Sequence, residues 1–251
     1  EILIGLVGSE MCIRDRMVGV FRSKKEENVL KGIRLFEPFS KEELGNICKI
    51  GGPTAIQGMV YCMISMVLTR MVAAFGAEAI ATQRVGGQIE SVSWNTADGF
   101  AAALNAFVGQ NYGAKKMDRV QKGYRISFWT VAIWGALIML AFIIFPGPIA
   151  GVFFHEEKAM EIAISYLIII GFSEAFMCVE LMTIGALSGL GKTKLCSVIS
   201  ITATSMRIPL AMVLSRTSLG LDGIWWALTL TSVAKGIIFY LTFRYQMREK
   251  C

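Results

Sequence analysis

Apolar residues dominate six successive segments of the chain, at 44–75, 78–111, 119–145, 156–188, 194–214 and 221–245. Each segment is long enough to cross a bilayer, because a spanning helix needs about 20 residues. The stretches between them are short, and several hold glycine or proline. The pattern predicts an all-α polytopic membrane protein, a bundle of six transmembrane helices in which successive helices are antiparallel neighbours. Pro209 predicts a kink inside the fifth helix.

The same pattern divides the chain into four parts. Residues 44–247 form the predicted six-helix lobe, and residues 248–251 form a short tail. Residues 17–43 are polar and mixed in charge, which is typical of a solvated linker. Residues 1–16 are interpreted as a junction segment foreign to the fold. A signal peptide is excluded there, because the apolar run at 2–7 is short and no basic region precedes it.

Composition and charge placement agree with a membrane protein. Hydrophobic residues make up 54% of the chain and charged residues 18%, with a mean hydropathy of +0.55. Soluble domains carry about 25% charged residues. Lysine and arginine gather after the second, fourth and sixth segments, whereas the other loops carry mainly acids. Cytoplasmic loops of membrane proteins are enriched in Lys and Arg, so we expect the basic side and both chain ends to be cytoplasmic.

Several kinds of chemistry are excluded by what the sequence lacks. The six cysteines have no CxxC spacing, and a single histidine, His155, cannot build a His-based metal site. The stretch 189–193 (GLGKT) misses the first glycine of a phosphate-binding loop, since position 186 is alanine. There is no HExxH or GxSxG motif, and the basic residues flank apolar segments rather than interleave with aromatics. We therefore predict neither an enzyme, nor a cofactor or resident metal, nor a nucleic-acid partner.

One stripe of polar residues lies within the second apolar segment. Glu90, Trp94 and Asp98 are spaced i, i+4 and i+8, so they share a helix face, and Asn95 lies beside them. Acids within a membrane span are costly and are functional candidates by default. Two carboxylates with an indole face predict a cation-binding site.

Further charges fall within the fourth, fifth and sixth segments. Glu180 has no basic neighbour in sequence and is a second candidate for ion binding, whereas Glu174 ranks lower. Arg207 and Lys235 are predicted to be counter-ions, so that one acid could instead belong to a structural ion pair. With Asp98 and Glu90, the deep charges comprise more acids than bases, which suits a pathway for cations.

A succession of short motifs extends over about 200 residues: 51–53 (GGP), 83–86 (QRVG), 89–91 (IES), 99–103 (GFAAA), 107–114 (FVGQNYGA), 185–193 (GALSGLGKT), 207–210 (RIPL) and 220–225 (GLDGIW). Together these motifs resemble the C-terminal lobe of multidrug and toxic compound extrusion (MATE) transporters. Some members place an acid in the first helix of this lobe, whereas this chain has Gln57 and Tyr61 there and no acid.

The resemblance implies one lobe of a two-lobe antiporter in the plasma (inner) membrane. Such a transporter exports small cationic or amphiphilic drugs or metabolites in exchange for Na⁺ or H⁺. By matched position, Glu90 and Glu180 would bind the coupling ion or the substrate. Residues 17–43 would link this lobe to an N-terminal lobe that the sequence does not contain.

Two alternatives stay open. A flippase of the same superfamily would carry lipid-linked oligosaccharide, and its cavity should be rich in cations for the pyrophosphate. The surplus of acids argues against it. The six-helix unit could also be inactive without its N-terminal lobe, because half a cavity cannot alternate access.

Overall fold

The computed structural model describes residues 40–248, and within that range the chain forms eight helices joined by short connections. They are α2 (Lys41–Ala73), α3 (Ala77–Gly113), α4 (Met117–Ile144), α5 (Pro146–Phe153), α6 (Glu157–Gly189), α7 (Thr193–Ser205), α8 (Arg207–Leu214) and α9 (Leu221–Arg248). The interpretations of residues 1–16, most of the linker and the last three residues lie outside the described range. The chain divides into two compact units, 1–46 and 47–251, and all the candidate site residues belong to the second.

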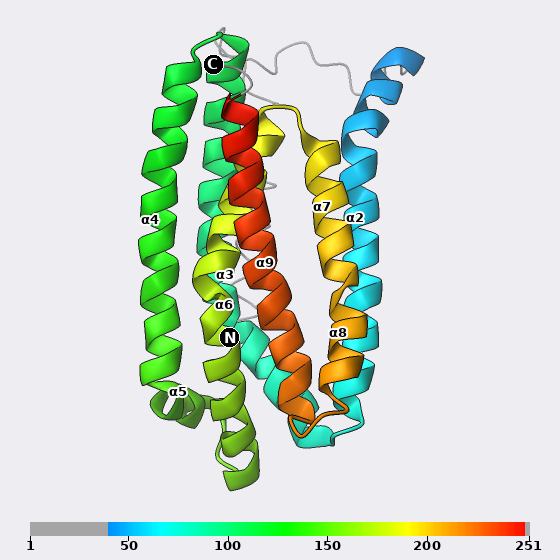
Figure 1. The fold of residues 1–251 in the computed structure, drawn as a ribbon, viewed down its shortest axis with the longest axis vertical. Helices are drawn as coiled ribbons and strands as arrows, with labels where there is room; N and C mark the ends of the chain where they lie inside the picture. The colour runs from blue at the N-terminus through cyan, green and yellow to red at the C-terminus, as the bar shows by residue number, and fades with distance from the viewer. Residues whose placement is uncertain (1–39, 249–251) are drawn as a thin grey trace, which may run out of the picture. The chain divides into compact units, whose positions relative to one another are not determined.

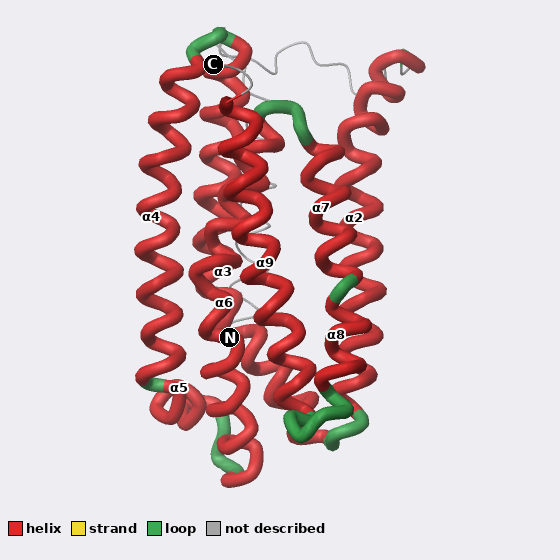
Figure 2. Tube along the Cα trace, viewed as in Figure 1, coloured by secondary structure: helices red, strands yellow, loops and turns green. Residues whose placement is uncertain are grey.

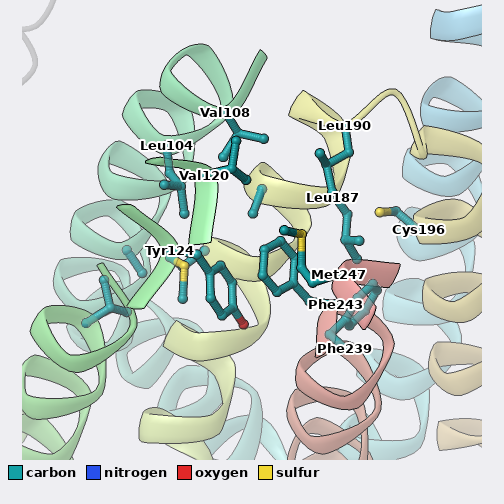
Figure 3. Packing of buried hydrophobic residues seen from close by; sticks show 14 of the residues in the cluster. Leu104, Val108, Val120, Tyr124, Leu187, Leu190, Cys196, Phe239, Phe243 and Met247 are labelled. Atoms are coloured by element: carbon teal, nitrogen blue, oxygen red, sulfur yellow. The ribbon is translucent and has the colours of Figure 1, made fainter. Parts of the chain in front are cut away.

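Helix α6 is the centre of this unit, because it packs against α3, α4 and α9 (Figures 1 and 2). The main hydrophobic core lies where these four helices meet near one end of the unit (Figure 3). It joins Leu104 and Val108 from α3, Tyr124 from α4, Leu187 from α6 and Phe243 from α9. Gly185 lets α3 and α6 approach closely, since a Cβ atom there would overlap the backbone of Ala101. Small residues at helix contacts are typical of membrane bundles.

All six predicted segments are helical, and five of them are long and apolar enough to cross a membrane: Gly51–Ala73, Met117–Ile144, Glu157–Gly189, Thr193–Leu214 and Leu221–Arg248. The remaining one, α3, has 37 residues. This length suffices to cross a bilayer, so α3 differs from the other five segments in its more polar composition. The six-helix, all-α fold is confirmed. The structure adds one element, the short helix α5, at a place where the sequence indicated only the end of a span.

The fifth predicted segment is broken rather than continuous. Helix α7 ends at Ser205 and α8 begins at Arg207. The break lies upstream of Pro209, because the proline nitrogen has no hydrogen to donate to the carbonyl four residues earlier. Arg207 is the first residue of α8 and so lies within the Thr193–Leu214 span.

The basic loops lie together at one end of the unit. The α3–α4 connection, the α6–α7 connection and the end of α9 share one end in Figure 1, and α8–α9 and α4–α5 connect at the other. The connections at the first end hold Lys115, Lys116 and Lys192, and Lys194 follows at the start of α7. The charge asymmetry read from the sequence is therefore an asymmetry of the folded unit.

Candidate functional site

The polar stripe of α3 runs from a partly buried position to exposed ones. Glu90 is partly buried, whereas Trp94, Asn95 and Asp98 are exposed. The other face of α3 is buried and includes Ser93. The structure thus separates the predicted stripe: Glu90 contacts the neighbouring helices, and the other three candidates line the open side of the same helix.

Glu90 is bound by a tyrosine from α6. The Tyr166 hydroxyl donates a hydrogen bond to Glu90 Oε1. Tyr166 is only 4% exposed, and its ring stands edge-on to Trp225 of α9 at a centroid distance of 5.0 Å. Gly86, one helical turn before Glu90, makes room for this ring, because a Cβ atom at residue 86 would overlap it. Packing from three helices therefore fixes the phenol against the carboxylate.

A second carboxyl group, that of Glu174, is completely buried beside the first. Its exposed fraction is 0%, and it interacts electrostatically with Glu90. Neither of its carboxyl oxygens has a hydrogen-bond partner among the described residues. Ser93 of α3 lies beside it, but the Ser93 hydroxyl also pairs with Cys178 Sγ at 3.3 Å. A buried carboxyl group without partners is costly unless a proton or a cation neutralises it.

Arg207 links α8 to α9 through hydrogen bonds. It stands at the start of α8, and its Nε and Nη2 atoms donate to Thr231 Oγ1 at 3.1 Å and Ser232 Oγ at 2.9 Å. It also interacts electrostatically with Glu90. Hydroxyls of α9 therefore hold the Arg207 side chain, and its charge acts on Glu90.

Glu180 faces α9 rather than α3. Lys235 Nζ lies 2.7 Å from Glu180 Oε1, and the two side chains are 9% and 6% exposed. This contact answers which acid pairs with Lys235, a question the sequence left open. Glu180 and Lys235 thus form a buried ion pair with each other. A role of Glu180 in ion binding remains a prediction.

The structure brings Glu174, which the sequence analysis ranked lower, beside Glu90, and it adds Tyr166, which the sequence analysis did not single out. A signal for both was present, because residues 166, 170 and 174 follow one another at i, i+4 and i+8 and so share a face of one helix. This face carries a hydroxyl and an acid within an apolar span, so the pattern predicts that it packs against polar groups of neighbouring helices.

Two carboxyl groups and a phenol, from Glu90, Glu174 and Tyr166, therefore lie together within the bundle, and the charge of Arg207 acts on Glu90. The described residues contain no group of three or more His, Cys, Asp or Glu side chains able to hold a metal ion. The arrangement suits a proton or a monovalent cation that binds and leaves, since carboxylate and hydroxyl oxygens are its available donors.

Comparisons with known proteins give a consistent result. A family model described as MatE matches residues 53–213. The chain is 28% identical over 211 residues to a probable multidrug resistance protein NorM of Thermotoga maritima, an alignment that covers 80% of this chain and 45% of the relative. The chain therefore spans about half the length of the curated relatives it matches.

Solved structures show the same fold. The bent form of the MATE transporter VcmN of Vibrio cholerae matches with a TM-score of 0.77 and 20% identity, over 89% of this chain and 50% of that one. A MOP superfamily transporter of Pyrococcus furiosus, described as having a binding pocket of reverse polarity, matches with a TM-score of 0.83 and 20% identity, over 96% of this chain and 54% of that one.

Proposed function

Because the chain belongs to the MatE family, we propose that it forms one half of a multidrug efflux transporter, which exports cationic or amphiphilic compounds in exchange for Na⁺ or H⁺. The membrane-spanning helices and the family match support a transporter. The relative from Thermotoga maritima is named a probable multidrug resistance protein, which supports the substrate class.

The buried carboxyl group of Glu174 beside Glu90 is the observation that carries this proposal. Two neighbouring carboxylates in a low-dielectric setting repel each other, so a proton or a cation is needed for both to stay buried. The Tyr166 hydroxyl bonds to Oε1 of Glu90. The other carboxyl oxygen of Glu90 receives no hydrogen bond from this tyrosine. We infer that the coupling proton or Na⁺ binds between these two carboxyl groups.

The exposed part of the α3 stripe gives a route for an exported cation. Asp98 and Trp94 lie on the same helix as Glu90 and face the open side. An aromatic face and a carboxylate attract an organic cation. A compound that reaches Glu90 would compete with the coupling ion there, and rocking of two lobes around a shared site would complete the exchange.

Glu180 remains a proposed second ion site with a specific requirement. Lys235 already neutralises its carboxylate at 2.7 Å. A cation could bind Glu180 only if the lysine moved away or lost its proton. Lys235 would then be the internal counter-charge of Glu180, and a coupling ion would replace it.

The flippase alternative finds less support. It needs free cations that face a pyrophosphate, but Lys235 is bound to Glu180, and Arg207 is held by Thr231 and Ser232. The surplus of acids around the site favours a cation as the ligand.

We also propose that the chain lies in the plasma membrane with its basic end in the cytoplasm. Lysine and arginine side chains gather at the end of the unit that holds the α3–α4 and α6–α7 connections. Retention of such residues on the cytoplasmic side is the general rule for membrane proteins.

Dye efflux from cells that express the full chain tests the proposal. Bacteria lacking their own exporters are loaded with ethidium, and the loss of fluorescence is followed for wild type, Glu90→Gln and Glu161→Gln. The last variant is the control, because Glu161 is an exposed acid of α6. We expect efflux for wild type and the control and none for Glu90→Gln. Equal efflux in all three excludes Glu90 as the ion site, and no wild-type efflux excludes export by this chain alone.

A further inference from the structure

A groove lies between α4 and α9 at the basic end of the unit, away from the carboxyl cluster. Its cavity volume is about 680 Å³, a size typical of small-ligand sites. Four cations line it, Lys122 and Arg125 from α4 and Arg244 and Arg248 from α9, with one acid, Asp118, among them. The described residues provide no ion pair within 4 Å for any of the four cations.

Aromatic side chains form the deeper part of the groove. Tyr124 and Phe243 are buried and stacked on each other with ring centroids 3.6 Å apart (Figure 3). Phe128 packs against Tyr240 at 5.2 Å, and the Arg244 guanidinium lies 5.9 Å from the centre of the Tyr240 ring. The groove thus joins a cationic mouth to an apolar floor.

Exposed apolar side chains continue from the groove along both helices. On α4, Lys122 and Arg125 share one face with Trp129, and Ile133, Leu137 and Leu140 continue it. Spacings of three and four residues keep these positions on one face. The exposed fractions, from 62% for Trp129 to 47% for Leu140, show that no part of the described chain covers this face.

Helix α9 repeats the pattern in the opposite direction. Leu230, Ile237 and Leu241 are exposed and share the face that ends in Arg244 and Arg248. Both helices have 28 residues, about 42 Å at 1.5 Å per residue, which matches a whole bilayer including its headgroup layers. The four cations fall within about two turns of the helix ends, at headgroup depth.

We propose that this groove binds an anionic phospholipid of the bilayer. Its phosphodiester headgroup lies among Lys122, Arg125, Arg244 and Arg248, and its acyl chains lie along the exposed apolar faces of α4 and α9. Charge complementarity selects the headgroup, because basic pockets between transmembrane helices attract anionic lipids. The apolar faces of α4 and α9 favour a lipid over a soluble anion, because a soluble anion has no acyl chains to pack against them.

Quenching of Trp129 by brominated lipid tests the proposal. The purified full chain is placed in bilayers that contain brominated phosphatidylglycerol or brominated phosphatidylcholine at the same mole fraction. The difference in quenching between wild type and Trp129→Phe isolates the signal of this tryptophan. We expect a preference for phosphatidylglycerol of about tenfold or more, which two basic residues near an anionic surface can supply.

Two double variants distinguish lipid binding in the groove from general attraction of anionic lipid to the basic end of the unit. Arg125→Gln with Arg244→Gln should abolish the preference, whereas Lys116→Gln with Lys194→Gln should keep it, since these exposed lysines do not line the groove. Equal quenching by both lipids, or equal loss in the two double variants, overturns the proposal. Loss of the preference on adding inorganic phosphate would assign the cations to a soluble anion and likewise overturn it. Neither outcome depends on drug export.

Discussion

Replacement of Lys235 by methionine isolates the buried ion pair that holds α6 against α9. Lys235 Nζ and Glu180 Oε1 are 2.7 Å apart, and both side chains are less than a tenth exposed. Removal of one partner of a buried pair leaves an uncompensated charge and costs about 3–5 kcal/mol. In a domain of this size each kcal/mol lowers the unfolding temperature by about 2–4 °C. We therefore expect Lys235→Met to lower it by on the order of 10 °C.

Thermal unfolding of the purified chain in detergent, followed by circular dichroism, measures the effect. The matched control is Lys158→Met, because Lys158 Nζ lies 3.6 Å from Glu78 Oε1 with a side chain that is 71% exposed. Exposed pairs of this kind contribute little, so no measurable change is expected. The double variant Lys235→Met with Glu180→Gln should regain most of the loss. Equal unfolding temperatures for the two lysine variants, or additive losses in the double variant, would refute the ion-pair reasoning.

Three other substitutions test the packing and the carboxyl cluster. Glu174→Met should raise stability by about 1–3 kcal/mol, the cost of an unpaired buried polar group, while efflux is lost; a melting curve and the dye assay check both effects. Tyr166→Phe removes a hydrogen bond to a carboxylate and should lower stability by about 1.5–3 kcal/mol, again read from melting. Gly185→Ala should destabilise by about 1–3 kcal/mol through its clash with Ala101, whereas Gly87→Ala meets nothing within 4 Å and should not.

The helices of this protein could be predicted from its sequence because their lengths are set by the bilayer. The segments 78–111 and 221–245 correspond to Ala77–Gly113 and Leu221–Arg248. The short helix α5 could not be predicted in the same way. The third apolar segment ends at residue 145, but proline favours the first turn of a helix, and α5 begins at Pro146.

The pairing of the charged residues could not be predicted, because it depends on how each helix is rotated about its axis. Helix α6 is apolar on nearly all sides, and both lipid and neighbouring helices accept apolar side chains. The sequence therefore did not show that Glu174 turns toward α3 while Glu180 turns toward α9. Glu90 was found from its sequence because its stripe on α3 is polar enough to define a face.

Ion release on drug binding tests the central claim, that Glu90 and Glu174 form a site where a coupling ion and a cationic compound compete. The measurement is calorimetric titration of the purified chain with ethidium in two buffers of different ionisation enthalpy, with and without Na⁺. We predict that ethidium binding releases a proton or weakens as Na⁺ is added, and that both effects disappear in Glu90→Gln. Ethidium binding that releases no proton, ignores Na⁺ and is unchanged in Glu90→Gln would contradict the account.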